Sequence, residues 1–106
     1  MYGQQERRGL LLQLKGLANP TRLRMLEVLA EHGEETVNEL ARSVRLSQPR
    51  ASWHLSLLRR GGLVRQRRQG RQVLCSVDFD AIRQGQRQLW ELLMQNRRLA
   101  VDLGGR

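Results

Sequence analysis

The sequence is poor in the residues that most often anchor or cross-link a small protein. Its 106 residues include a single cysteine, Cys75, so no disulfide can form within a subunit, which is consistent with a reducing cytoplasm. Aromatic residues make up only 4% of the chain. A monomer of this size buries roughly 60–65% of its unfolded surface. We therefore expect one domain, residues 1–106, that buries further apolar surface by forming a dimer.

Long hydrophobic runs are also missing. No apolar stretch is long enough to span a bilayer, and Gln13 and Lys15 interrupt the leucine-rich beginning of the chain. Leu10, Leu14 and Leu17 recur at helical spacing, which predicts an amphipathic helix over roughly residues 5–17 rather than a signal peptide. The sequence therefore predicts a cytoplasmic protein with no membrane partner.

Negative charge is absent from the middle of the chain. No acidic residue occurs between Glu39 and Asp78, whereas this stretch carries nine arginines, equal to the whole formal net charge of +9. Such a charge suits nucleic acid, an anionic membrane surface or an acidic protein. Exposed helices usually mix both signs, so an unmixed basic block favours contact with a polyanion over a chance distribution. Guanidinium groups match phosphates and guanine edges, which favours nucleic acid.

Caps and glycines predict two helices in the part of the chain that follows. Asn19 precedes Pro20, a pair typical of a helix start, and Gly33 ends this second helix. Thr36 opens a short third helix and forms a capping box with Glu39. The apolar stripe of the second helix is expected to hold Leu23, Met25, Leu26, Leu29 and Ala30.

A tight turn then leads to a fourth helix, which Ser47 caps and Gly61–Gly62 end. The short helix Thr36–Val44, the turn and the fourth helix form a helix-turn-helix arrangement. In this arrangement the fourth helix is the recognition helix. Its inward face is predicted to hold Ala51, Leu55 and Leu58, with His54 at the edge.

The hydrophobic period changes after this helix. Leu63–Arg67 and Gln72–Val77 are predicted strands of a hairpin, and Arg67, Arg68 and Arg71 lie at or near its turn. A last helix follows Asp78. Gly85 and Gln86 are expected to weaken its middle, and Trp90 is assigned to a dimer interface. Its apolar side is expected to hold Phe79, Ile82, Leu89, Leu92, Leu93 and Leu99.

The predicted fold class is mainly α with a small β-hairpin wing, a winged helix-turn-helix in the order α-α-α-α-β-β-α. Pro49, Trp53, Ser56 and Arg60 are predicted to face outward on the recognition helix, with Arg50 and Ser52 beside them. In the major groove, Gln48 could pair with adenine and Arg50 with guanine or a phosphate, and Ser47 suits a phosphate. An outward Trp53 predicts contact with DNA, and partial burial against the hairpin is its alternative.

Three motifs carry a family resemblance. The opening of the second helix, "LANPTRLRML", the recognition segment, "LSQPRASWHLSLLRRGGLV", and the "GR" of the wing resemble the ArsR/SmtB family of bacterial winged-helix repressors. The resemblance implies a homodimer built from the first and last helices. It also implies that the protein binds a partly palindromic operator and that an inducer releases the protein from this DNA. DNA contacts are implied for the wing arginines and for Ser47, Gln48, Arg50, Ser52 and Trp53. The outward-facing Ser56 completes the set of predicted DNA contacts.

The sequence departs from the metal-sensing members of that family. Their thiol site uses Cys-x-Cys after Glu-Leu, but here Glu39-Leu40 is followed by "ARS". Their other site uses Asp-x-His, but Ile82 stands two residues after Asp80. No cofactor is therefore predicted, although a non-standard metal site at the dimer interface stays open. The soft or borderline donors of the chain lie on three separate elements: His32, His54 and Cys75.

Structural roles, rather than catalytic or metal-binding ones, are expected for most of these residues. His54 is expected to pack or to contact backbone or phosphate, and His32 to complement a helix dipole. Cys75 shares one face of a strand with Val73 and Val77, which predicts a small core residue.

The sequence gives less support to functions other than that of a repressor. No nucleophile–base pair, paired carboxylates or phosphate loop occurs, so the sequence does not predict an enzyme. One alternative is a DNA-binding or adaptor protein that works with a separate protein corepressor instead of sensing a ligand. A nonspecific architectural DNA-binding protein is another. Salt dependence together with discrimination between sequences separates the repressor from both.

Overall fold

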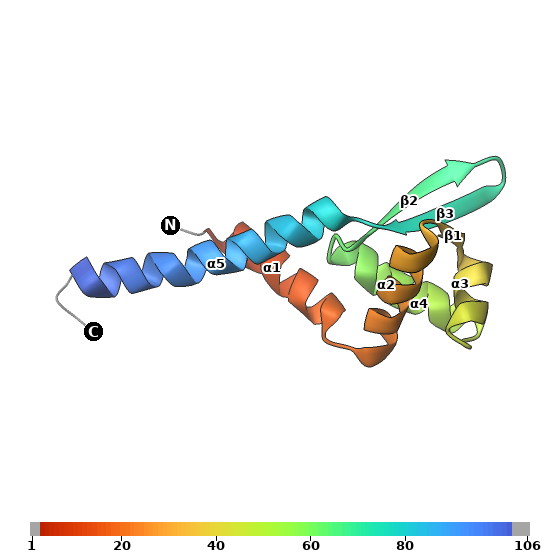
Figure 1. Ribbon diagram of the computed structural model, residues 1–106, viewed down its shortest axis with the longest axis horizontal. Coiled ribbons are helices and arrows are strands. Elements are labelled where there is room, and N and C mark those ends of the chain that lie inside the picture. The colour runs from red at the N-terminus through yellow and green to blue at the C-terminus, as the bar shows by residue number, and fades with distance from the viewer. Residues whose placement is uncertain (1–2, 103–106) are drawn as a thin grey trace.

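The computed structural model describes residues 3–102, and it describes side chains as far as residue 98. Its helices surround one face of a small sheet, and a long last helix projects away from them (Figure 1). The predicted order of four helices, a hairpin and a final helix is confirmed, with one additional short strand. The elements are α1 (Gln4–Leu17), α2 (Pro20–His32), β1 (Glu35–Thr36), α3 (Val37–Ser43), α4 (Gln48–Arg60), β2 (Val64–Gln69), β3 (Gln72–Val77) and α5 (Phe79–Asp102).

The helix starts follow the predicted capping. The side chain of Asn19 accepts a hydrogen bond from the backbone N–H of Arg22 at 3.0 Å, with Pro20 in the first turn. Thr36 and Glu39 form both hydrogen bonds of a capping box. Gly33 ends α2 with a φ of 89°, a backbone conformation that costs a residue without a Cβ very little.

The three strands form an antiparallel sheet in the order β1-β3-β2. The hairpin strand β2 begins at Val64 and continues to Gln69, so the predicted limits Leu63 and Arg67 were wrong and the wing is longer. The turn is Gly70 and Arg71, with Gly70 at a φ of 62°. Strand β1 was not predicted, because two residues are too few to show a period.

The core lies between α2, α3, α4 and the inner face of the sheet. On α4 the predicted inward residues Ala51, Leu55 and Leu58 are all buried, and Cys75 is a buried core residue as expected. On α2 the prediction was partly wrong. Leu23 is 51% exposed and Ala30 is also exposed. Met25, Leu26 and Leu29 are buried as predicted, and Arg22 and Val28 are buried in place of Leu23 and Ala30.

Helix α1 is fastened to α5 by a buried glutamine. Gln13 Nε2 donates to the carbonyl oxygen of Ala81 at 3.0 Å. A Cβ on Gly85 would overlap the side-chain amide of Gln13. A glycine inside a helix costs about 1 kcal/mol relative to alanine. Here the absence of a side chain makes room for Gln13, so α5 requires a glycine at this position. From the sequence, Gly85 was expected only to weaken the helix.

The apolar side of α5 is only half covered by the rest of the chain. Ile82, Leu89 and Leu92 are half-buried, as a helix against α1 would be. Phe79 and Leu93 are each 58% exposed, so their predicted burial is not met within a single chain. The side chain of Leu99 lies outside the described residues.

Candidate nucleic-acid interface

The recognition helix α4 has one buried and one open face. Ala51, His54, Leu55 and Leu58 are buried, so the opposite face of the helix turns away from the core. Trp53 is 59% exposed, which confirms its outward direction. The other predicted contact residues on this helix and its cap are exposed or half-buried: Ser47, Gln48, Arg50, Ser52 and Ser56. The contact of this set with DNA stays a prediction.

Short hydrogen bonds hold several of these side chains in place. Gln48 Nε2 donates to Ser52 Oγ at 3.1 Å, one helical turn further on. Ser56 Oγ donates to the carbonyl oxygen of Trp53 at 2.6 Å. Ser47 Oγ accepts from the backbone N–H of Arg50 at 3.4 Å and so caps the helix. The ring of Trp53 meets the ring of His54 edge-on, with centroids 4.9 Å apart. Trp53 therefore keeps an open indole face on the surface.

A buried arginine joins the recognition helix to the end of α1. Arg22 donates to the carbonyl oxygens of Gly16 at 2.8 Å and Lys15 at 3.2 Å. Its Nη1 lies 3.2 Å from Nδ1 of the buried His54. Since a guanidinium only donates, Nδ1 accepts and the ring proton sits on Nε2. Burial lowers the pKa of His54 below its usual value, and the charges of Arg22 and Arg50 lower this pKa further.

His54 therefore packs in the core as expected, but its partner is a side chain rather than backbone. Sequence reasoning did not find Arg22, because the two residues are 32 positions apart. The available signal was an arginine that falls on the buried face of α2 between Leu26 and Leu29 on the helical repeat.

The wing arginines fall into two groups. Arg67 makes a two-pronged ion pair with Glu34, with Nε–Oε2 and Nη2–Oε1 distances of 2.7 Å each. Arg65 Nε lies 3.5 Å from Asp78 Oδ2. In the part of the chain that the structure describes, the side chains of Arg68 and Arg71 make no ion pair or hydrogen bond. The hydrogen bond from Arg67 holds the pKa of Glu34 below its usual value. Sequence reasoning did not find Glu34.

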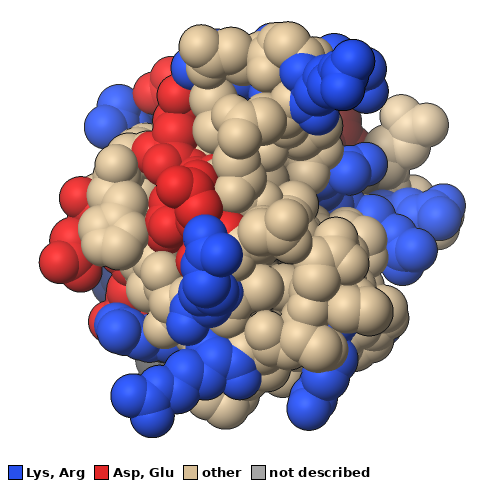
Figure 2. Space-filling model, turned by 90° about the vertical axis from the view of Figure 1, so that its right-hand side faces the viewer, with Lys and Arg blue, Asp and Glu red and all other residues tan. Residues whose placement is uncertain are grey.

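The tip of the wing and the start of α4 border one hollow. It has a volume of about 230 Å³ and brings together the predicted contacts Gln48 and Arg71. Its remaining lining comes from the end of β1, the start of α3 and the start of β3: Thr36, Val37, Asn38, Gln72 and Val73. Figure 2 shows this end of the molecule, where basic side chains surround a mostly uncharged centre and acidic side chains gather on one side. Hydrogen-bond donors and positive charge thus lie together at this end of the molecule, as nucleic acid binding requires.

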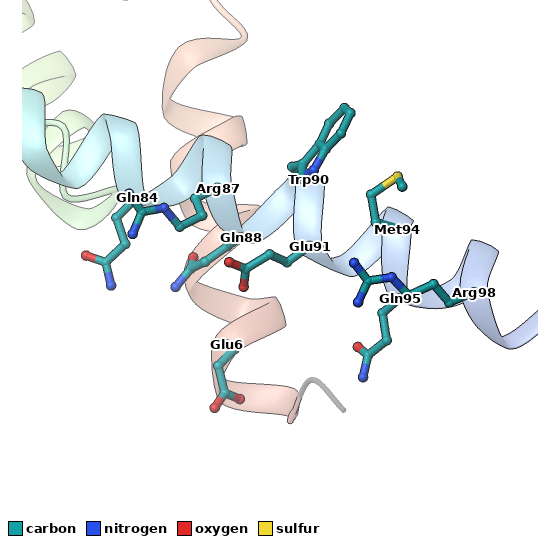
Figure 3. A pocket seen from close by; sticks show the side chains of 9 residues that line it. All are labelled: Glu6, Gln84, Arg87, Gln88, Trp90, Glu91, Met94, Gln95 and Arg98. Atoms are coloured by element: carbon teal, nitrogen blue, oxygen red, sulfur yellow. The ribbon is translucent and has the colours of Figure 1, made fainter.

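Away from the wing, α1 and α5 expose large apolar side chains. Leu11 on α1 is 64% exposed, and Trp90 and Leu93 on α5 are 66% and 58% exposed. A groove of about 850 Å³ lies at Trp90 and Met94, and its other lining residues are polar or charged side chains of α5 together with Glu6 of α1. Figure 3 shows Trp90 and Met94 projecting from the same side of α5. Large exposed apolar side chains on neighbouring helices are typical of a protein–protein interface.

The described residues form neither a metal centre nor a membrane span. Among them, no group of three or more His, Cys, Asp or Glu side chains could hold a metal ion. None of the described helices has the length and apolar character needed to cross a lipid bilayer.

The chain is similar to proteins of one family. A helix-turn-helix domain family matches residues 17–67. An arsenic resistance transcriptional regulator of Pseudomonas putida is 46% identical over 59 residues, which cover 56% of this chain and 46% of that protein. A probable mercury resistance operon repressor of Streptomyces lividans is 39% identical over 88 residues, covering 83% of this chain and 64% of that protein. The chain thus spans about half to two thirds of these relatives.

A solved structure matches over nearly the whole length. It is the homodimeric winged helix-turn-helix DNA-binding domain of a possible ArsR-family transcriptional regulator from Mycobacterium bovis. The TM-score is 0.69 at 30% sequence identity, and the match covers 90% of this chain and 91% of that domain. Helix α5 and the wing are therefore matched along with the central helices.

Proposed function

We propose, because this chain belongs to the ArsR family of winged helix-turn-helix regulators, that it is a homodimeric, sequence-specific DNA-binding repressor that an inducer releases from its operator. The observation that carries the proposal is the placement of predicted contacts at one end of the molecule. Gln48 and the unpaired Arg71 border the same hollow, and Trp53 is exposed on the same helix as Gln48. A protein with this action works where the DNA is, in the cytoplasm of a bacterial cell.

In the proposed complex, α4 lies in the major groove with its N-terminal half toward the base edges. Gln48 pairs with adenine, Arg50 with guanine or a phosphate, and Trp53 packs on a sugar or a thymine methyl group. Ser47, Ser52 and Ser56 are proposed to contact the backbone. Arg68 and Arg71 bind phosphates from the wing. Arg67, also predicted as a contact, is already paired with Glu34 and is not assigned to a phosphate.

The partner at the other end is proposed to be a second copy of this chain. Leu11 lies on α1, and Trp90 and Leu93 lie on α5, two helices that contact each other. A two-fold axis there would place the two α4 helices on half-sites about one helical turn apart, roughly 34 Å. The homodimeric domain from Mycobacterium bovis supports this proposal.

DNA binding by this arrangement needs no cofactor, and we propose none. The two relatives are regulators of arsenic and mercury resistance, but the positions of the thiol ligands of metal-sensing members are held here by "ARS" after Leu40. The inducer of this protein is therefore proposed to be recognised by other groups than a Cys-x-Cys pair.

Selection of bound duplexes from a random pool tests the proposal. We expect recovery of a partly palindromic sequence with two half-sites, and the same sequence near a gene that the protein controls. A pool that emerges unenriched, while binding stays salt-dependent, would indicate an architectural protein and overturn the repressor proposal.

A further inference from the structure

The register of the sheet separates the wing arginines by face. Side chains alternate along a strand, so Arg65 and Arg67 share one face of β2 and Gln66 and Arg68 share the other. Gln66 pairs with the buried Cys75, and its Nε2 lies 3.6 Å from Cys75 Sγ. The face of Gln66 and Arg68 is therefore the inner face, toward the core and α4. Arg67 lies on the outer face.

The Glu34–Arg67 pair sits where the wing leaves the body of the protein. Thr36 and Arg67 both pair with Leu74, and this is the last rung at which the sheet has three strands. Beyond it the hairpin has only the two strands β2 and β3 and projects from the body (Figure 1). Arg67 Nη2 also donates to Gln69 Oε1 at 3.3 Å, nearer the tip. The guanidinium thus connects the segment before β1 with the projecting part of the wing.

The position of the Glu34–Arg67 pair lets it fix the direction of the wing, even though the pair adds little to the free energy of folding. Ion pairs between exposed groups contribute about 0–1 kcal/mol to folding. A bidentate arginine–carboxylate pair nevertheless fixes relative orientation, because two parallel hydrogen bonds leave little rotational freedom. A two-stranded hairpin on its own is marginally stable, so it needs such a contact to hold one direction. A fixed wing places Arg68 and Arg71 against phosphates at a smaller entropy cost on binding.

We propose that Glu34 and Arg67 are positioning residues for DNA binding, which orient the wing, and that the phosphate contacts of the wing are made by Arg68 and Arg71. The inference rests on the proposed function and narrows it. It replaces the expectation that Arg67 touches phosphate with a contact inside the protein. It also gives an acidic residue next to the DNA-binding end a favourable role in binding.

The sign of the effect at Glu34 separates this role from simple electrostatics. Glu34→Ala removes a negative charge near the DNA, and electrostatics alone predicts tighter binding. Positioning predicts weaker binding, by about 3- to 10-fold, with the dependence of log affinity on log salt unchanged. Arg67→Ala should weaken binding to a similar degree and also leave this slope unchanged, whereas removal of a phosphate-binding charge lowers the slope by about 0.9 for each phosphate.

The charge-reversed double variant Glu34→Arg with Arg67→Glu is the decisive member of the series. Positioning predicts that it recovers most of the affinity that each single reversal loses, because the ion pair is restored in the opposite sense. A glutamate at a phosphate contact would instead repel the DNA. No recovery, tighter binding by Glu34→Ala, or a reduced salt slope in Arg67→Ala would each overturn the proposal.

Arg65→Ala serves as the matched control, since it removes an equal charge from the same face but leaves the Glu34–Arg67 pair intact. We expect it to bind DNA nearly as the unaltered protein does. A measurement without DNA keeps the test independent of the proposed function. Backbone NMR order parameters at residues 69–71 should fall in Glu34→Ala and in Arg67→Ala, and recover in the double reversal. If the protein binds no DNA but these order parameters change as expected, only the proposed function fails. If they do not change, the positioning role fails.

Discussion

The two ends of the molecule differ in the chemistry of what they leave exposed. At the wing and recognition helix, Arg68 and Arg71 carry charge with no partner among the described side chains. On α1 and α5, Leu11, Trp90 and Leu93 expose large apolar surfaces instead. In its described part, the single chain supplies neither counter-charges for these two arginines nor apolar surface to cover the exposed apolar side chains, so each end indicates a partner of a particular chemistry. A polyanion suits the first end, and a second apolar face suits the other.

The difference teaches that pairing matters more than charge density. The wing alone carries four arginines, Arg65, Arg67, Arg68 and Arg71, yet two of them are occupied by carboxylates from other parts of the chain. A count of basic residues treats all four alike. The structure distinguishes arginines that organise the protein from arginines that are free to bind DNA.

The largest expected effect comes from breaking the apolar end. Leu93→Glu places a charge in the proposed dimer interface, and we expect monomers at micromolar concentration in analytical ultracentrifugation. Operator affinity should fall by about 100-fold or more, because disrupting a central interface residue costs on the order of 2 kcal/mol or more and one subunit reaches only one half-site. Leu23→Glu, on the exposed face of α2, is the control and should leave the dimer unchanged. A Leu93→Glu dimer of unaltered stability would contradict the assigned interface.

The next effect comes from the charged end. The double variant Arg68→Ala with Arg71→Ala should weaken binding to all DNA sequences by about 10-fold or more at moderate salt. The slope of log affinity against log salt should fall by about 0.9 for each phosphate that the variant no longer neutralises. The dimer should be unaffected. Arg24→Ala, which removes a charge from α2, provides the comparison. Equal effects from the two variants would show that only net charge matters.

A smaller and more selective effect is expected at Gln48. Gln48→Ala should relax the choice of base at one position in each half-site, by about 1–3 kcal/mol of discrimination, with little change in binding to random duplex. Affinities for a set of single-base operator variants measure this. Gln5→Ala on α1 is the matched control. A uniform loss over all positions would place Gln48 on the backbone rather than at a base.

The smallest expected effect is the pH dependence of stability that comes from His54, whose contact with Arg22 joins the recognition helix to the end of α1. The lowered pKa of His54 means that the unfolded chain binds this proton more readily than the folded one. Its contribution to stability is therefore complete above a pH of about 6.5, the ordinary value, and is lost as pH falls below it. The carboxylates Glu34 and Glu39, whose pKa values are lowered from 4.5, act in a separate and more acidic range.

Denaturant unfolding at pH 5 to 8 checks this expectation. His54→Asn keeps an acceptor for Arg22 but cannot be protonated, so the free energy of unfolding should lose the part of its pH dependence below about pH 6.5 that comes from this residue. His32→Asn is the control for the other histidine. An unchanged pH dependence in His54→Asn would contradict a neutral, Arg22-bound His54.

What could be predicted from the sequence was local. Caps at Asn19, Thr36 and Ser47 and the inward face of α4 follow from short-range rules, and the structure confirms them. What could not be predicted depends on contacts far apart in the chain. Arg67 and Glu34 are 33 positions apart. Sequence patterns identify which residues are basic, but not which of them meet a carboxylate after folding.

The same limit explains the errors on the helices. Leu23 fits the helical repeat of apolar residues, yet the buried face of α2 includes Arg22 because that side chain reaches carbonyl oxygens at the end of α1. Gly85 is unfavourable by propensity, yet Gln13 occupies the space that a side chain would need. In both places a tertiary contact overrides a local preference.

The measurement that tests the central claim most directly is the affinity of the dimer for its selected operator and for a scrambled duplex, each over a range of salt. We expect affinity for both to fall steeply with salt, and the operator to bind at least about 10³-fold more tightly near physiological salt. Equal affinities for the two duplexes, or no binding to either, would contradict the account.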